Sequence, residues 1–291
     1  MDLLLEPLGT TIFIRALVAS ALVGIVCAVV GTYVVLRGIA FIGDAIAHAG
    51  FPGVVAAYML SIPFYVGAAI AAVSTALAIG WVTKRAGIRQ DTAIGVLFAG
   101  TFALGVFLFS TIQGYVADLF SFLLGNVLAI GPEDLVALVV IGGGVIVVVA
   151  LLWKELLYAT FDPLGAAASG IPVDRLEYLF LALVALTIVV SLQAVGIILV
   201  VAMLITPAAT AQLVSVRFTR LMLVAALVGV GSSVIGLYLS YWFDVASGAT
   251  IVLVQTAAFI LALAFGPRGL LARRGGRLAE PQTDDVHGVV A

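Results

Sequence analysis

The sequence predicts an all-α, polytopic membrane protein, built as a bundle of eight or nine helices that cross the bilayer. Of its 291 residues, 64% are apolar and only 10% are charged, whereas a typical soluble domain carries roughly 25% charged residues. The apolar residues also fall into long runs, as a bilayer requires, at about 20 residues per helix. This composition excludes a water-soluble globule, a disordered chain and a nucleic-acid-binding protein. The single cysteine, Cys27, excludes an internal disulfide and is expected to act as a small buried apolar residue.

The first half of the chain contains four apolar runs of spanning length, each closed by charge or by glycine and proline. The first run ends at Arg37, and the third is closed by a charged loop that begins at Lys84. The second run is unusual because it contains both Asp44 and His48. The four predicted spans cover residues 11–36, 39–60, 63–82 and 92–112.

The second half contains five further spans and one apolar run that is too short to cross comfortably. The short run, residues 119–130, lies between Asp118 and Pro132. Residues 177–216 are long and apolar enough for two crossings with a tight reversal near residues 193–196. The remaining predicted spans cover residues 135–153, 221–243 and 250–265. The total is nine if every run crosses, and eight if one lies flat or is re-entrant.

The distribution of charge supports this arrangement and orients it. If the nine spans cross the membrane in alternating directions, twelve of the thirteen basic residues lie on one side of the membrane. That side is therefore predicted to be cytoplasmic. These residues are Arg37, Lys84, Arg85, Arg89, Lys154, Arg175, Arg217, Arg220, Arg268, Arg273, Arg274 and Arg277. We therefore predict a multi-pass protein of the cell membrane with a cytoplasmic C-terminus. The transmembrane domain is predicted over residues 1–271, followed by a polar, disordered tail over residues 272–291.

One ionisable pair is predicted inside the membrane. Asp44 is the acidic residue that must lie within a span, where a carboxylate costs about 2.5–3.5 kcal/mol on insertion scales. His48 follows four residues later, which places it about 40° around and about 6 Å along the same helix. A carboxylate beside an imidazole forms half of a site for Mn²⁺, Fe²⁺ or Zn²⁺. The alternative is a structural hydrogen bond between Asp44 and His48 or a neighbouring helix.

A second candidate element lies in the cytoplasmic loop after the fifth span. Asp162 suits a helix N-cap, Pro163 the first helical position and Gly170 the residue just past the end. The alanines between them favour a short helix of about two turns. We expect this helix to dock on a cytoplasmic partner, unless it is only a local loop helix lying on the membrane. The candidate docking residues are Asp162, Pro163, Leu164, Ala166, Gly170 and Ile171.

Several segments of the chain resemble a known family. Residues 35–49, Val-Leu-Arg-Gly-Ile-Ala-Phe-Ile-Gly-Asp-Ala-Ile-Ala-His-Ala, resemble the signature of the permeases of metal-ion ABC importers. Five shorter segments recur in the order and spacing of that family. They are residues 91–95, 124–129, 162–171, 204–210 and 247–250.

The resemblance implies a fold like that of type II ABC importers and a permease that works as a homodimer by alternating access in membrane lipid. It implies two cytoplasmic ATPase subunits and an extracytoplasmic metal-binding protein as partners. Residues 162–171 then correspond to the coupling helix, and Asp44 and His48 to metal contacts in the channel. The chain has no G-x-x-x-x-G-K-[ST] motif, so ATP is expected to act on the partner subunit and not on this chain.

The same resemblance implies a transported ion and no permanently bound cofactor. The region from residue 84 to residue 130 is more similar to the manganese branch of the family than to the zinc branch, so Mn²⁺ is the expected cargo and Zn²⁺ or iron the alternative. The predicted outer mouth is acidic and is expected to attract a cation, although these side chains also suit solvated helix caps. The acids in question are Asp118, Glu133, Asp134 and Asp244.

Two other classes of protein fit the residues less well. An ion-coupled secondary carrier needs further ionisable groups in the membrane besides Asp44 and His48, and purification with a bound ATPase would exclude it. An intramembrane serine protease needs a base near Ser247, but His48 lies far upstream and in the wrong order. The permease of an ATP-driven importer is therefore the preferred prediction.

Overall fold

The computed structural model describes residues 6–112 and 127–268, and within them every regular element is a helix. Eight helical segments of this part are long and apolar enough to cross a membrane. The predicted all-α class is therefore confirmed, and the eight candidate spans agree with the predicted range of eight or nine. The predicted tail, residues 272–291, lies outside the described residues, and the boundary of the transmembrane domain remains a prediction.

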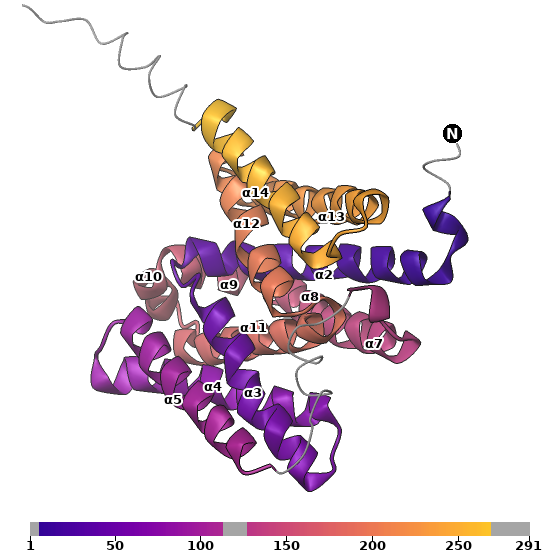
Figure 1. Ribbon diagram of the computed structural model, residues 1–291. Helices are drawn as coiled ribbons and strands as arrows, with labels where there is room; N and C mark the ends of the chain where they lie inside the picture. The colour runs from indigo at the N-terminus through magenta and orange to yellow at the C-terminus, as the bar shows by residue number, and fades with distance from the viewer. Residues whose placement is uncertain (1–5, 113–126, 269–291) are drawn as a thin grey trace, which may run out of the picture.

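Within each of the two described ranges, the helices follow one another with short connections, as drawn in Figure 1. The elements are η1 (Pro7–Gly9), α2 (Thr11–Leu36), α3 (Ile42–Leu60), α4 (Phe64–Ala86), α5 (Gln90–Ser110), η2 (Val127–Ala129), α7 (Pro132–Ala137), the π-helical turn η3 (Leu138–Gly142), α8 (Gly143–Leu151), α9 (Trp153–Phe161), α10 (Pro163–Ala168), α11 (Val173–Val195), α12 (Ile197–Val214), α13 (Phe218–Phe243) and α14 (Ser247–Phe265).

The predicted and observed spans differ mainly at their ends. The fifth span runs over Pro132–Leu151 and begins three residues earlier than predicted, because Asp134 accepts a hydrogen bond from the Gly131 backbone nitrogen and starts α7 at Pro132. Most of the short run at residues 119–130 lies outside the described residues. Its last part forms the single turn η2.

Helices α2 and α11 form the centre of the molecule. Helices α3, α4 and α5 pack together on one side of this pair, and α12, α13 and α14 pack together on the other. In the most apolar part of each span, 72% of the residues of α11 are buried, against 11% in α14. The central helices are therefore enclosed by protein, while the two outer groups present apolar surface.

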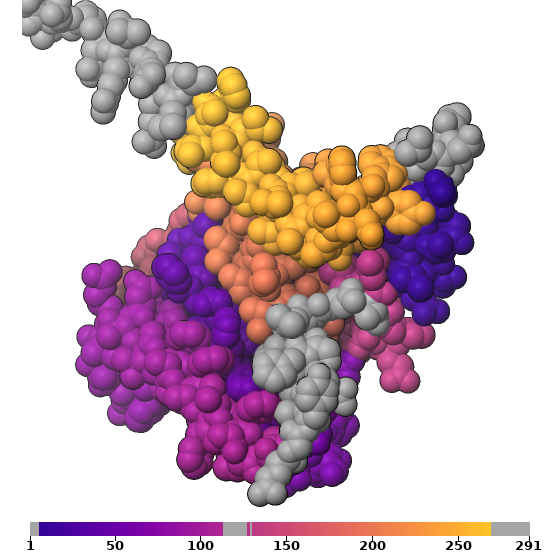
Figure 2. Space-filling view, viewed as in Figure 1, coloured from indigo at the N-terminus to yellow at the C-terminus, as the bar shows by residue number. Residues whose placement is uncertain are grey.

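In Figure 2 the yellow α14 lies at the top of the molecule and the magenta α5 at its lower left, so the two helices are well separated in this view. Both carry large exposed apolar side chains, among them Val96 and Phe107 on α5 and Leu253 and Phe265 on α14. Apolar patches of this extent are rare on soluble monomers. They suit contact with lipid tails or with another apolar surface.

The helical conformation is interrupted between α11 and α12 at Gly196, within the predicted reversal. Gly196 has a φ of +84° and its backbone nitrogen still donates to the Leu192 carbonyl oxygen. Glycine is favoured here because a Cβ is strained at this backbone conformation. The break ends α11 and redirects the chain into α12, so the predicted position is confirmed.

Helix α3 is the predicted second span, and it is not among the eight most apolar segments. It has the length of a span, but Asp44, His48 and Pro52 reduce its apolar character. It packs between α4 and α5 and against α11 and α12. The neighbouring helices thus shield most of α3 and hold its polar residues in place.

Candidate functional site

Asp44 and His48 lie on the same face of α3, as predicted from their spacing. The Nδ1 atom of His48 is 3.4 Å from Oδ1 of Asp44 and 3.0 Å from the Asp44 backbone oxygen. The backbone carbonyl oxygen can only accept a hydrogen bond, so Nδ1 carries the proton and donates it. In the neutral ring this leaves the Nε2 lone pair free, which is the arrangement of a histidine ready to bind a metal ion.

The pair is open on one side. The side chain of Asp44 is 46% exposed and that of His48 is 28% exposed. On the other side, the His48 ring packs edge-on against Phe98 and Phe102 of α5, at 5.5 and 5.6 Å between centroids. The aromatic rings fix the imidazole while the carboxylate faces outward. The chain therefore presents two metal-type ligands at an open surface of α3.

In the part of the chain that the structure describes, no third His, Cys, Asp or Glu joins this pair to complete a metal site. Cys27 is fully buried, and its Sγ lies 3.8 Å from the Ser191 hydroxyl oxygen. It behaves as the small buried residue that was expected. The arrangement offers one carboxylate and one imidazole, which bind a divalent cation weakly unless other groups contribute.

The predicted loop helix is α10, and its caps are those expected from the sequence. The Asp162 carboxylate accepts a hydrogen bond of 2.8 Å from the Gly165 backbone nitrogen, and Pro163 occupies the first helical position. Gly170 follows the helix with a φ of +83°. The Gly170 and Ile171 nitrogens donate to the Ala167 and Ala166 carbonyl oxygens, which is a Schellman ending.

The surface of α10 is small and apolar. Leu164 is 84% exposed, and Ala166 is buried beneath it. A hollow of about 480 Å³ lies beside the helix, lined by Ala167, Ile171 and the first residues of α11. A capped helix with an exposed leucine beside a hollow has the shape of a docking element.

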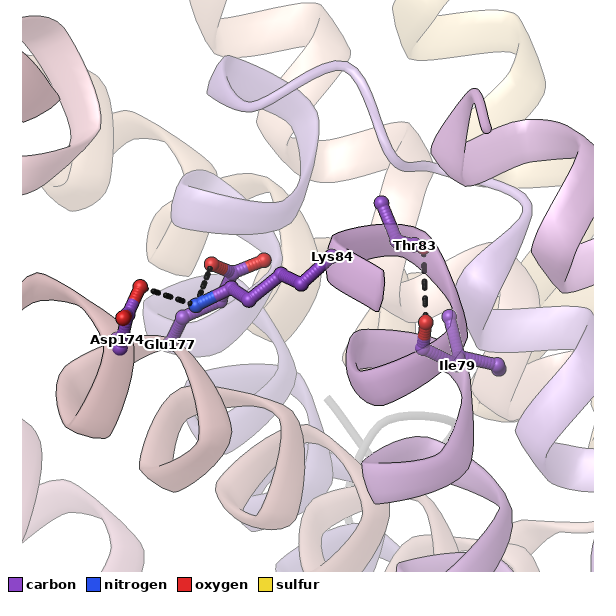
Figure 3. A network of polar contacts seen from close by, with 5 residues as sticks. All are labelled: Ile79, Thr83, Lys84, Asp174 and Glu177. Atoms are coloured by element: carbon purple, nitrogen blue, oxygen red, sulfur yellow. Dashed lines mark hydrogen bonds and ion pairs between the residues drawn. The ribbon is translucent and has the colours of Figure 1, made fainter. Parts of the chain in front are cut away.

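A group of charged residues near α10 was not predicted as a unit. Lys84 at the end of α4 bonds to Asp174 and Glu177 at the start of α11 (Figure 3). Arg37, at the end of α2, donates from Nε to the Thr160 hydroxyl at 3.1 Å. Burial lowers the pKa of the Arg37 guanidinium, and the nearby Glu177 carboxylate acts in the opposite direction.

From the sequence, Lys84 and Arg37 were predicted only to lie on the cytoplasmic side near the ends of helices, and no partner was predicted for them. Lys84 and Asp174 are 90 positions apart, so their pairing depends on how α4 and α11 pack. The Lys84 and Arg37 contacts bring two further predicted cytoplasmic connections, those after the first and third spans, to the same end of the bundle as α10. That placement agrees with the sidedness derived from the basic residues.

Three of the acids predicted at the outer mouth, Glu133, Asp134 and Asp244, lie at helix ends in the part of the chain that the structure describes. The Asp134 carboxylate accepts hydrogen bonds from the Tyr65 hydroxyl and from the Gly131 nitrogen, and Glu133 lies beside it in the first turn of α7. Asp244 ends α13 with a φ of +50°, and Asp118 lies outside the described residues. For Asp134 and Asp244, the geometry is that of residues at helix ends.

The sequence profile of the ABC 3 transport family matches residues 10–266, which is most of the chain. The chain belongs to the ABC 3 transport family. This ABC transport protein is 49% identical over 269 residues to the manganese transport system membrane protein MntC of Halalkalibacterium halodurans, covering 91% of this chain and 92% of that one. It is 40% identical to a probable iron transport system membrane protein of Haemophilus influenzae, covering 91% and 97%.

The fold of this ABC 3 family member is also similar to a solved structure. It matches a chain of PsaBC from Streptococcus pneumoniae, solved in complex with a Fab, with a TM-score of 0.82 and 35% identity, over 93% of this chain and 98% of that one. The resemblance inferred from the short segments is thereby confirmed. It extends over nearly the whole described bundle, with Asp44, His48 and α10 inside it.

Proposed function

We propose that the chain is the membrane permease of an ATP-driven importer and that its cargo is a divalent transition-metal ion, foremost Mn²⁺. The observation that carries this proposal is the Asp44–His48 pair on α3, with Nδ1 engaged and Nε2 free. Ionisable groups inside a membrane protein are expensive and mark ion pathways by default. Relatives named for manganese transport, such as MntC, support the choice of ion.

The site is completed by a second copy of the chain. One copy supplies a carboxylate oxygen and an imidazole nitrogen, and both side chains are partly exposed. In a homodimer whose axis passes this face of α3, two copies of Asp44 and His48 supply four ligands to one ion. Four protein ligands leave the remaining coordination positions of the ion to water, so the site can hold an ion in transit and still release it.

The ligand types admit more than one metal. Carboxylate and imidazole ligands suit Mn²⁺, Fe²⁺ and Zn²⁺, and the soft thiolate that would favour a softer ion is absent among the described ligands. Iron is the second candidate because relatives named for iron transport are 38–41% identical to the chain. Zn²⁺ remains an alternative from ligand chemistry.

Movement of the ion is driven from the cytoplasmic side. We propose that α10 inserts the exposed Leu164 into a groove on each of two ATPase subunits, while an extracytoplasmic metal-binding protein delivers the ion from outside. Closure of the ATPases then turns the permease from outward-facing to inward-facing in the cell membrane. ATP is hydrolysed on the partner, and the chain itself performs no catalysis.

Transport in reconstituted vesicles tests this proposal. The chain, its ATPase and its metal-binding protein are placed in proteoliposomes, and uptake of radioactive Mn²⁺ is followed with and without ATP. We expect uptake that requires ATP hydrolysis and that unlabelled Mn²⁺ inhibits more strongly than Fe²⁺ or Zn²⁺. Uptake driven by an ion gradient without ATP would instead establish a secondary carrier, and stronger inhibition by Fe²⁺ would make iron the cargo.

A further inference from the structure

Charged and polar side chains tie the helices on both sides of α10 to the rest of the bundle. On one side, Nζ of Lys84 lies 2.7 Å from Oδ1 of Asp174 and 2.8 Å from Oε2 of Glu177 (Figure 3). The same nitrogen lies 5.0 Å from the centre of the Tyr178 ring. Lys84 therefore holds the first turn of α11, which directly follows α10, to the end of α4.

On the other side, Arg37 holds α9, which directly precedes α10. Its Nε donates to the Thr160 hydroxyl at 3.1 Å, two residues before the N-cap of α10. Its guanidinium carbon lies 4.2 Å from the centre of the Phe180 ring of α11. One basic side chain thus contacts both helices that flank the docking helix.

The Arg37 contact lies at a hollow between the helix ends. The hollow has a volume of about 290 Å³ and is lined by Arg37, Thr160, Pro163 and Glu177 and by apolar residues of α2, α9 and α11. Helix α11 also packs directly against α2 and α4. The side chains of Arg37 and Lys84 add polar links to this packing at the end of the bundle where α10 lies.

From α2 and α4 the connection continues to the metal ligands. Arg37 ends α2, and α3 begins five residues later and carries Asp44. Helices α3 and α4 touch backbone to backbone: a Cβ on Gly53 would collide with the Gly67 carbonyl oxygen, and a Cβ on Gly67 with that of Gly53. Helices in such close contact move together, so displacement of the end of α4 displaces α3.

We propose that Lys84 and Arg37 are positioning residues that couple movement of the docking helix α10 to movement of α3, which carries Asp44 and His48. This inference rests on the proposed function and adds a role that the metal ligands and α10 do not supply. With the Lys84 link removed, ATPase closure still moves α10, but α3 follows less completely. The expected defect is hydrolysis of ATP with reduced import of metal.

The test compares hydrolysis and transport in the same proteoliposomes, made from the complete permease, ATPase and metal-binding protein. Mn²⁺ is the probe, and the measured quantity is Mn²⁺ imported per ATP hydrolysed. Lys84→Met is expected to lower this ratio by about fivefold or more, the range of typical coupling between sites. Lys84→Arg keeps the charge and is expected to restore it. Arg85→Met is the matched control, since Arg85 is exposed and forms no ion pair in the described residues.

The outcomes separate this inference from the proposed function. A wild-type complex that imports no Mn²⁺ on ATP hydrolysis contradicts the proposed function and, with it, the inference. Normal wild-type transport with an unchanged ratio in Lys84→Met contradicts the inference alone. If Lys84→Met fails to assemble, Glu177→Gln decides, because it removes one ion pair with little change in shape. A lowered ratio in that variant supports the coupling role, and an unchanged one overturns it.

Discussion

Gly31 of α2 lies against the backbone carbonyl of Leu204 of α12, so that a Cβ at residue 31 would collide with that oxygen. The Leu204 side chain also reaches α3, where its Cδ2 would stand 2.9 Å from a Cβ at Gly43. Gly43 directly precedes Asp44. One leucine therefore sets the distance between α12, the central helix α2 and the metal-ligand end of α3.

Gly31→Ala is expected to destabilise the protein. The added methyl group meets backbone, which cannot rotate away, and overpacking of this kind costs about 1–3 kcal/mol. Thermal unfolding of the purified protein in detergent measures the effect. Gly100→Ala on α5 is the matched control, because a Cβ there has open space around it and alanine favours helix over glycine. Equal melting temperatures for the two variants would contradict the close contact of α2 with α12.

Asp44→Asn is expected to lower ATP-dependent Mn²⁺ uptake by about tenfold or more, since even the partners of metal ligands contribute 10–100-fold to affinity. The amide keeps the shape of the side chain but loses the negative charge that attracts the cation. His48→Gln is expected to act in the same direction, because it removes the free Nε2. Uptake is compared at equal amounts of protein in the membrane.

Asp91→Asn is the control for these two variants. It removes a carboxylate from the first turn of α5, away from the pair on α3. Its uptake is expected to equal that of the wild type. Unimpaired uptake in Asp44→Asn would instead mean that the pair has the structural role considered from the sequence, a hydrogen bond inside the bundle.

Much of the fold was predictable because the bilayer restricts it. Apolar runs of spanning length gave the helices, and residues with special backbone requirements gave their ends: Gly196 breaks α11 from α12, and Gly170 closes α10. The packing was not predictable. Most of these helices are apolar on all sides, so the sequence does not tell which face of a helix is buried and which meets lipid.

The site was predictable as far as its elements are local. Asp44 and His48 share one helix face at a spacing of four residues, and Asp162 and Pro163 cap α10 within a single turn. The ion pair of Lys84 with Asp174 joins residues 90 positions apart, and only the packing of α4 on α11 brings them together. Of the acids predicted near the outer mouth, Asp134 forms the helix cap that the sequence also allowed, through the Gly131 nitrogen, whereas its contact with Tyr65, 69 positions away, depends on packing.

Asp162→Ala is expected to loosen α10. The substitution removes the side-chain acceptor of the Gly165 nitrogen, and loss of such a cap costs about 0.5–2 kcal/mol. A helix of six residues has no stability of its own to absorb this loss. Hydrogen exchange of the backbone amides of residues 165–171 should become faster. Asp162→Ser retains a capping oxygen and should keep exchange close to that of the wild type.

Leu164→Asp tests the docking surface without disturbing the fold. Leu164 is 84% exposed, and substitutions at exposed positions usually change stability by no more than about 0.5 kcal/mol. The free chain should therefore unfold at the same temperature. A central apolar anchor of an interface contributes more than about 1–2 kcal/mol to binding, so the variant should bind the ATPase about tenfold more weakly and lose ATP-dependent uptake.

The matched control for Leu164→Asp is Val216→Asp, which places the same charge on a residue that is 71% exposed between α12 and α13, outside α10. Affinity is measured by titrating the labelled ATPase against the permease in detergent. Weaker binding in the Leu164 variant and normal binding in the Val216 variant assign docking to α10. If both variants bind normally, the ATPase docks elsewhere, and α10 is the local loop helix that its sequence also allowed. If both bind weakly, the contact extends beyond α10 to the connection between α12 and α13.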